Sequence, residues 1–171
     1  MQERKGITAI EGNPLTLIGP ELKTGDKAPD FTAADNNMAP SSLKDFKEKV
    51  LIISAVPSLD TPVCDIETQK FNSEAAKLGH SIKIITISMD LPFAQKRWCG
   101  ANNVDNVTTL SDHKDASFGT SFGVLIKELR LLARSVFVLD EERIIRDMII
   151  LDEVTNEPDY NRIIESAKKL I

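Results

Sequence analysis

The sequence predicts an α/β fold in which a mixed central sheet is flanked by helices. Two continuous apolar runs, VLIISAV at 50–56 and KIITISM at 83–89, are typical of strands that are buried on both faces. A segment with helical character follows each run, and a strand pair and a final helix close the chain. Strands that alternate with helices pair in parallel, whereas a hairpin adds antiparallel strands, so these observations together indicate a mixed sheet.

A β-hairpin is expected before this sheet. Residues 7–18, ITAIEGNPLTLI, form two short apolar stretches around the turn sequence Gly-Asn-Pro at 12–14. The polar residues 19–29, which are rich in turn formers, are expected to form a loop. We therefore expect a single domain over residues 1–171, with residues 1–19 as an N-terminal hairpin extension within it.

Two helices are expected to follow the two buried strands. The first runs from the sequence PSLDTP to about Leu78, and Gly79 stops it. Its apolar residues recur at helical spacing: Phe71, Ala75 and Leu78. The second is the short segment LPFAQKRWC at 91–99, with Asp90 as its N-cap and Gly100 as its end.

The remaining elements complete the order. VTTLS at 107–111 predicts a third strand, and residues 115–122 predict a weaker helix. Residues 135–140 and 143–151 are expected to form a hairpin, and DYNRIIESAKKLI at 159–171 an amphipathic helix. The apolar side of that helix comprises Ile163, Ile164, Ala167, Leu170 and Ile171. This order of elements is that of a thioredoxin-like fold.

Composition and charge exclude several classes of function. The 171 residues have a net charge of -5, which argues against nucleic acid as the main partner, because phosphate binding requires a basic face. No run of about 18 apolar residues is present to span a membrane, and the charged start MQERKG is no signal-peptide core. The chain is therefore expected to be cytoplasmic. His80 and His113 lack Cys or carboxylate clusters at ligand spacing, so neither a metal nor another cofactor is expected.

The two cysteines, Cys64 and Cys99, are too few for a disulfide scaffold, and a reducing compartment would keep them as thiols. Cys64 ends the sequence PSLDTPVC at 57–64. Thr61 suits a helix N-cap and Pro62 the first helical position, so Cys64 falls in the first turn of the helix. Free backbone N–H groups and the helix dipole favour the nucleophilic thiolate there. On local sequence alone, a structural cap that happens to precede a packing cysteine stays an open alternative.

Three separate blocks carry a family resemblance. PSLDTPVC at 57–64 fits the Pro-x-x-x-Thr-x-x-Cys signature of the peroxiredoxins. The sequences SLDTPVCDIETQKFN around Cys64, FAQKRWCGA around Cys99 and ARSVFVLD around Arg134 closely resemble the bacterial thiol peroxidases, which are atypical 2-Cys peroxiredoxins. The extended N-terminal hairpin is similar to that branch as well, so the resemblance covers essentially the whole chain.

The resemblance implies a thiol-dependent peroxidase that reduces hydrogen peroxide and organic hydroperoxides. Cys64 would be the peroxidatic cysteine, and Cys99 the resolving cysteine that traps the Cys64 sulfenic acid as an intramolecular disulfide. Thioredoxin would then reduce this bridge, and a homodimer is expected because the family typically forms one. Apolar Leu59 and Phe93 would line the substrate pocket and favour bulky organic hydroperoxides.

The resemblance also assigns roles around the sulfur. The Thr61 hydroxyl, the Arg134 guanidinium and the backbone N–H groups near Val63 and Cys64 would stabilise the negative charge that develops on the peroxide oxygens. Pro57 would shape the pocket and shield the sulfur from water.

Strand topology supports the expected position of Arg134. If strand 135–140 runs antiparallel to strand 50–56, its start lies at the edge of the sheet where strand 50–56 ends. The guanidinium would then meet Cys64. Without the resemblance, Arg134 would be read as a polar residue at a strand edge.

The two cysteines are expected on one side of the molecule but apart. Strands 50–56 and 83–89 should be parallel with a right-handed crossover, so Cys64 and Cys99 emerge at the same edge. Cys99 follows Asp90 by about nine residues, roughly 13 Å along a helix, whereas a disulfide needs Cα atoms within about 7 Å. Closing the bridge would therefore require unwinding of the first turn at Cys64, of the end of the helix that carries Cys99, or of both.

Two other interpretations remain open. A thioredoxin-class dithiol oxidoreductase normally has Cys-x-x-Cys, but Glu67 occupies the position three residues after Cys64. A peroxide sensor or redox-switched binding module would use oxidation of Cys64 only to change shape. Cys99 could likewise be a packing residue beside Trp98.

Overall fold

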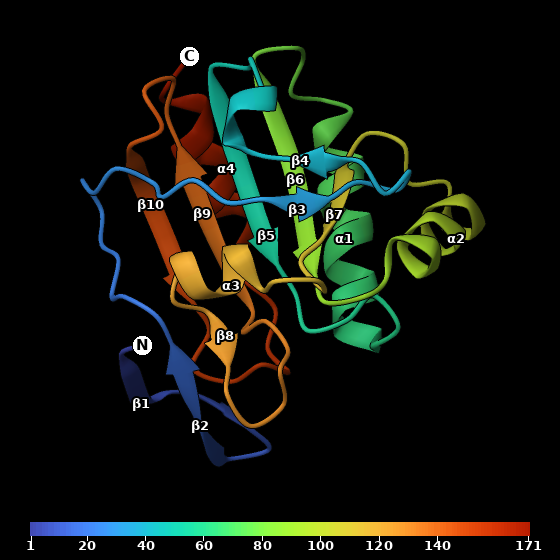
Figure 1. Cartoon of the computed structure of the whole chain (residues 1–171). Helices are drawn as coiled ribbons and strands as arrows, with labels where there is room; N and C mark the ends of the chain where they lie inside the picture. The colour runs from blue at the N-terminus through green and yellow to red at the C-terminus, as the bar shows by residue number, and fades with distance from the viewer.

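The computed structural model describes all residues, 1–171, and its centre is a seven-stranded mixed sheet (Figure 1). The strand order is β10-β9-β5-β6-β7-β3-β4, and a second, three-stranded sheet has the order β1-β2-β8. The elements are β1 (Glu3–Ile10), β2 (Asn13–Ile18), β3 (Ala33–Ala34), β4 (Pro40–Ser41), the 3-10 helix η1 (Leu43–Asp45), β5 (Val50–Ala55), α1 (Pro62–Ala75), β6 (Ile82–Ser88), α2 (Pro92–Asn102), β7 (Thr108–Ser111), α3 (Ser117–Ser121), β8 (Leu125–Ile126), β9 (Ser135–Leu139), β10 (Ile145–Ile150) and α4 (Tyr160–Lys168).

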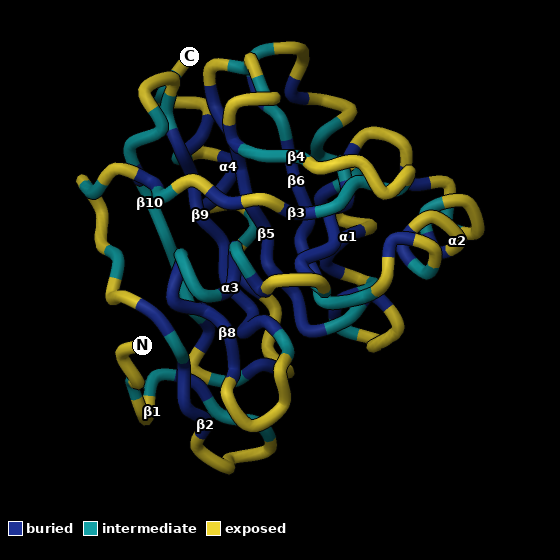
Figure 2. Tube along the Cα trace, viewed as in Figure 1, coloured by how far each residue is buried: buried dark blue, intermediate teal, exposed yellow.

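The predicted mixed sheet is confirmed. β5 pairs in parallel with β6, from Val50 opposite Ile82 to Ala55 opposite Ile87, and antiparallel with β9 on its other side. All six residues of β5 are buried, as a continuous apolar run predicts, and they lie along the dark blue centre of Figure 2. β7 continues the parallel part beside β6, and β10 continues the antiparallel part beside β9.

The strand residues divide between two cores because side chains alternate across a sheet. Val50 and Ile52 of β5 belong to the core under α1 and α4, whereas Leu51 and Ile53 belong to the core on the opposite face. The first core also receives Phe71, Trp98, Ile163, Ile164 and Ala167 from the helices. The second contains four aromatic rings, each in contact with at least two of the others, and Leu15 and Leu17 of β2; the rings are Phe31, Phe118, Phe122 and Phe137.

The N-terminal hairpin is longer than the apolar pattern indicates. β1 begins at Glu3 rather than at residue 7, and its first residues are polar and largely exposed, so they carry no periodic signal. Glu11 and Gly12 form the two-residue turn with φ values of 49° and 76°, a conformation that Gly adopts without steric cost. β8 joins the hairpin through only two residue pairs with β2, too short a strand to detect from sequence.

The predicted boundaries of the 91–99 helix were wrong at both ends. Leu91 is the N-cap and Pro92 the first helical residue, because the Asp90 carboxylate is engaged elsewhere. Gly100 lies inside α2, where its exposed position tolerates the cost of about 1 kcal/mol relative to Ala. The helix ends at Asn102, and Asn103 adopts the left-handed conformation with φ of 54°.

The last helix is shorter than its amphipathic pattern. α4 ends at Lys168, and Ile171 is 60% exposed, so it is not part of the buried side that the sequence predicts. The N-cap is Asp159, whose carboxylate accepts the backbone N–H of Arg162 at 3.0 Å.

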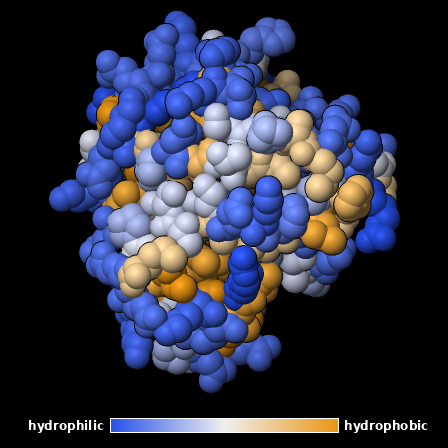
Figure 3. Space-filling model, viewed as in Figure 1, coloured by the Kyte–Doolittle hydropathy of each residue, from blue (hydrophilic) through white to orange (hydrophobic).

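One face of the molecule is shown as a space-filling surface in Figure 3. The face in Figure 3 is largely hydrophilic, and its hydrophobic side chains gather over the lower part, around β8 and the hairpin. None of the helices combines the length and the apolar character that crossing a membrane requires.

Candidate active site

Cys64 lies where β5 hands over to α1. β5 ends at Ala55, residues 57–61 form a loop, and α1 begins at Pro62, so Cys64 occupies the third helical position. There it is fully buried and faces the start of β9 rather than solvent. The strand-to-helix placement that the sequence predicts for this cysteine is therefore confirmed.

Thr61 has the N-cap backbone conformation, with φ of -101° and ψ of 144°, but its hydroxyl makes no capping bond. Its Oγ1 atom contacts instead the Cys64 sulfur and, at 2.8 Å, the carbonyl oxygen of Ser58. A hydroxyl has one proton, so it can donate to only one of these two partners at a time. When Cys64 is a thiol, the S–H can donate to Thr61; when Cys64 is a thiolate, Thr61 can donate to the sulfur.

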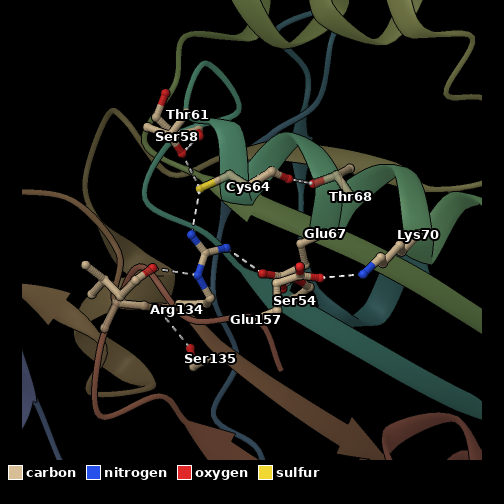
Figure 4. A network of polar contacts seen from close by, with 12 residues as sticks. Ser54, Ser58, Thr61, Cys64, Glu67, Thr68, Lys70, Arg134, Ser135 and Glu157 are labelled. Carbon is tan, nitrogen blue, oxygen red and sulfur yellow. Dashed lines mark hydrogen bonds and ion pairs between the residues drawn. The ribbon is translucent and has the colours of Figure 1, made fainter. Parts of the chain in front are cut away.

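The Arg134 side chain contacts the same sulfur from the segment that precedes β9 (Figure 4). Ala55 pairs with Ser135, so Arg134 directly precedes the strand residue that faces the end of β5. Its Nη2 atom lies 3.1 Å from Cys64 Sγ, and its Nε donates to the Val154 carbonyl at 2.8 Å. The side chain is 2% exposed. The antiparallel arrangement that predicts this meeting is confirmed.

Glu67 completes the cluster and was not assigned a role from the sequence. Its Oε2 accepts from Arg134 Nη1 at 2.5 Å, and its Oε1 accepts from the Ser54 hydroxyl at 2.7 Å. Figure 4 shows the guanidinium between Glu67 and Cys64. Residues three positions apart share a helix face, so the position of Glu67 three residues after Cys64 was the sequence feature that could have indicated its place in this cluster.

Burial governs the electrostatics of this ion pair. Burial raises the pKa of the Glu67 carboxyl, and the Arg134 guanidinium and the Ser54 hydroxyl offset the rise only in part. Burial alone would lower the pKa of Arg134, but Glu67 and then Cys64 outweigh it and leave that pKa raised. Arg134 is therefore a fixed positive charge beside the sulfur.

Cys99 packs against the same core as Cys64, but its sulfur has a different polar partner. It lies on α2, is half-buried, and its sulfur is 3.5 Å from the Thr109 hydroxyl on β7. The structure brings Cys64, Thr61 and Arg134 together but does not bring the Cys99 sulfur among them. Both cysteines are free thiols.

The residues expected to bind substrate lie in different surroundings. Pro57 is buried and Val63 is half-exposed at the start of α1. Leu59 is 2% exposed and packs in the same core as Cys64, so it offers almost no surface to a substrate. Phe93 is 67% exposed near the start of α2. No three His, Cys, Asp or Glu side chains gather as they would around a metal ion.

Comparisons with known proteins show the family to which the chain belongs. The Redoxin family model matches residues 23–164. The thiol peroxidase of Bacillus subtilis is 59% identical over 162 residues, which cover 95% of this chain and 96% of that protein, and the thiol peroxidase of Halalkalibacterium halodurans is 53% identical, with 93% and 95% covered.

Solved structures agree. A peroxiredoxin-like protein from Aquifex aeolicus superposes with a TM-score of 0.90 at 39% identity and full coverage of both chains. A thiol peroxidase from Chromobacterium violaceum shares the fold, with a TM-score of 0.84 at 19% identity over 95% of each chain. The chain therefore belongs to the thiol peroxidases of the redoxin family and is a peroxiredoxin-type enzyme.

Proposed function

We propose that this thiol peroxidase reduces hydrogen peroxide and organic hydroperoxides, with Cys64 as the attacking group. The observation that carries the proposal is the Cys64 sulfur itself, which lies in the first turn of α1 with the Arg134 guanidinium 3.1 Å away and the Thr61 hydroxyl in contact. A cation, a hydroxyl donor and a helix N-terminus all favour the thiolate, which is the nucleophilic form of cysteine.

The chemical step transfers one oxygen atom to sulfur. The Cys64 thiolate attacks the hydroperoxide oxygen that carries the hydrogen, the S–O bond forms, and the O–O bond breaks. The leaving oxygen takes the bonding electron pair, accepts a proton from solvent, and departs as water or as an alcohol. Cys64 is left as a sulfenic acid.

The surrounding donors stabilise the charge that moves onto the oxygens. Arg134 has Nη2 directed at the sulfur, so the same guanidinium can donate to a peroxide oxygen that approaches there. Thr61 supplies a hydroxyl, and the backbone N–H groups near Val63 supply further donors at the helix start. Glu67 touches no reacting atom; it is a positioning residue that holds Nη1 of Arg134.

Resolution involves the second cysteine. The Cys99 thiolate attacks the sulfur of the Cys64 sulfenic acid, the S–S bond forms, and the S–O bond breaks. The hydroxide that leaves takes one proton from solvent and becomes water. The Cys64 sulfur contacts Arg134 and the Cys99 sulfur contacts Thr109, and neither cysteine is in a disulfide. We infer that the segments that carry the two sulfurs rearrange before the bond forms. This supports a disulfide formed by local unwinding.

Recycling and assembly follow the family. Thioredoxin is the proposed reductant of the Cys64–Cys99 bridge: its thiolate attacks one sulfur of the bridge and its second thiol completes the reduction. We also propose that the enzyme is a homodimer. Both proposals are supported by membership of the thiol peroxidases, to which the chain belongs.

A coupled assay tests the whole cycle. NADPH oxidation through thioredoxin reductase and thioredoxin is measured with hydrogen peroxide and with an alkyl hydroperoxide. Cys64→Ser should abolish consumption of both substrates, whereas Cys99→Ser should still react with peroxide but fail to sustain NADPH oxidation, because its Cys64 sulfenic acid has no partner thiol with which to form the disulfide. Continued turnover by Cys64→Ser would overturn the proposal.

A further inference from the structure

The residues next to the two cysteines are hydrogen bonded to each other. Asp65 follows Cys64 on α1, Trp98 precedes Cys99 on α2, and the indole Nε1 of Trp98 donates to Asp65 Oδ1 at 2.9 Å. Gln69, one turn further along α1, is 2.9 Å from Asp65 Oδ2 and 3.5 Å from Asn102 Oδ1 on α2. We call these four residues, Asp65, Gln69, Trp98 and Asn102, the clasp.

The hydrogen bonds of the clasp that join α1 to α2 form only when both helices keep their observed positions. Trp98 is 9% exposed and packs in the same core as Cys64, and a buried indole N–H needs an acceptor. Asp65 provides a charged acceptor from the first turn of α1, where the helix dipole also favours a carboxylate. Asn102 donates to the Trp98 carbonyl at 2.9 Å and so fixes the last turn of α2.

Movement of Cys64 toward Cys99 must break this link. The first turn of α1 is closed by the bond from the Asp65 N–H to the Thr61 carbonyl at 3.0 Å. Unwinding that turn, to take the sulfur away from Arg134, displaces Asp65 as well. The indole N–H of Trp98 would then lose its acceptor while the ring is still buried. A buried donor without a partner costs more free energy than a donor that can bond to water instead.

We propose that the clasp is a redox-linked latch that sets the rate at which the Cys64–Cys99 disulfide closes. The inference rests on the proposed function, since it presupposes that bridge. With the clasp shut, α1 keeps Cys64 against Arg134 and Thr61, ready for peroxide. After the sulfenic acid has formed, the clasp must open before the Cys99 thiolate can reach it.

A latch of this kind also controls overoxidation. While the clasp is shut, the sulfenic acid of Cys64 persists, and a second peroxide molecule can oxidise it to the sulfinic acid, with water or an alcohol as the other product. A weaker clasp shortens the lifetime of the sulfenic acid. The same hydrogen bond therefore keeps Cys64 in position to react with peroxide but also makes the enzyme more sensitive to overoxidation by excess peroxide.

Rapid-quench alkylation of the full-length reduced enzyme tests the latch. Free thiols are counted at intervals after one equivalent of hydrogen peroxide, in Asp65→Ala, Asp65→Asn and Trp98→Phe. Asp65→Ala removes the acceptor, whereas Asp65→Asn removes the charge but keeps an oxygen that can accept. We expect disulfide closure to be roughly tenfold faster in Asp65→Ala and Trp98→Phe, which abolish the hydrogen bond. Asp65→Asn should accelerate closure less, because removing the charge weakens the hydrogen bond but keeps an acceptor.

The double variant Asp65→Ala/Trp98→Phe provides the internal control. If the two side chains act through one hydrogen bond, the double variant should close its disulfide no faster than either single variant. The sulfinic acid formed at high peroxide, measured by mass spectrometry, should fall in the same variants. Because Trp98 is the only tryptophan, its fluorescence during oxidation of the wild type should change together with loss of the thiols.

Two failures are distinguishable. Equal closure rates in Asp65→Ala and Asp65→Asn, with Trp98→Phe also unchanged, would overturn the latch and leave the proposed peroxidase intact. A wild-type enzyme that consumes peroxide without forming the intramolecular disulfide would overturn the proposed resolution step and the latch with it. If Asp65→Ala fails to fold, the rate in Trp98→Phe decides.

Discussion

The guanidinium of Arg134 bridges Glu67 and Cys64 through two different nitrogens, with Nη1 2.5 Å from Glu67 Oε2 and Nη2 3.1 Å from Cys64 Sγ. All three side chains are almost completely buried. The carboxylate therefore fixes the direction in which the cation faces the sulfur. A lysine, with one rotatable ammonium group, could not make both contacts in this fixed geometry.

Replacement of Arg134 should affect rate and stability together. Arg134→Lys keeps a charge but loses the planar fork, and we expect peroxide reduction about 10²-fold slower, the scale of losing one preorganised donor. Arg134→Gln also strands Glu67 in the core, so its unfolding free energy should fall by about 3–5 kcal/mol. Stopped-flow rates and urea denaturation measure the two effects.

A matched control is Arg146→Gln, which removes a half-exposed arginine paired with Asp140 near the turn between β9 and β10, at the end of β9 opposite to Arg134. This variant should keep the wild-type rate and lose no more than about 1 kcal/mol of stability. A wild-type rate in Arg134→Lys would contradict the directional role of the guanidinium.

The raised pKa of Glu67 makes a prediction about pH and stability. Burial raises the pKa of this carboxyl above its ordinary value of 4.5, so the folded state binds the proton more tightly than the unfolded chain. The contribution of Glu67 to the unfolding free energy is then fully present below pH 4.5 and is lost as the pH rises through the folded pKa. Glu67→Gln cannot titrate at this position.

The measurement is the difference in unfolding free energy between the wild type and Glu67→Gln, from urea titrations between about pH 4 and pH 8. As the pH rises, the unfolding free energy of the wild type should fall relative to that of Glu67→Gln. The contributions of the other carboxylates are common to both proteins and cancel in the difference. A difference that is flat, or that moves toward the wild type, would show that burial does not dominate at Glu67.

Thr61 offers a test of a single hydroxyl. Thr61→Val keeps the shape but removes the O–H that contacts the Cys64 sulfur, and Thr61→Ser keeps the O–H. We expect Thr61→Val to reduce peroxide roughly 10²-fold more slowly and Thr61→Ser to stay within about tenfold of the wild type. If the valine variant is as fast as the serine variant, the hydroxyl has no part in the reaction.

Asp90 is expected to hold the active-site loop. Its carboxylate accepts from Ser58 Oγ at 2.6 Å, Leu59 N at 2.8 Å and Ser88 Oγ at 2.7 Å. Asp90→Ala leaves these donors without an acceptor and should lower the unfolding free energy by about 1–3 kcal/mol. Urea denaturation measures this loss, and hydrogen exchange at the Leu59 amide should accelerate. Unchanged exchange at Leu59 would show that the loop does not depend on Asp90.

The sequence predicts most of the sheet because its strands carry strong local signals. β5 and β6 are continuous apolar runs, and their parallel pairing follows from the helix between them. The position of Arg134 could also be predicted, because one antiparallel pairing fixes which edge the residue occupies. Two-residue strands such as β3 and β8 depend on tertiary pairing and leave no such pattern.

Sequence reasoning missed Glu67 and misplaced Asp90, two side chains whose partners are distant in sequence. Glu67 resembles a solvated helix residue until Arg134, 67 positions away, is placed beside it. Asp90 is a good N-cap by residue type, but Ser58 and Leu59 in the active-site loop engage its carboxylate, so α2 begins later. Short-range patterns carry no information on such long-range hydrogen bonds.

The most direct test is the detection of the sulfenic acid on Cys64. Cys99→Ser, treated with one equivalent of hydrogen peroxide and then with a sulfenic acid trap, should carry the trap on the peptide that contains Cys64. Cys99→Ser/Arg134→Lys should acquire it much more slowly. Labelling elsewhere, or equal rates in the two proteins, would contradict the claim that Arg134 directs the Cys64 sulfur at the peroxide.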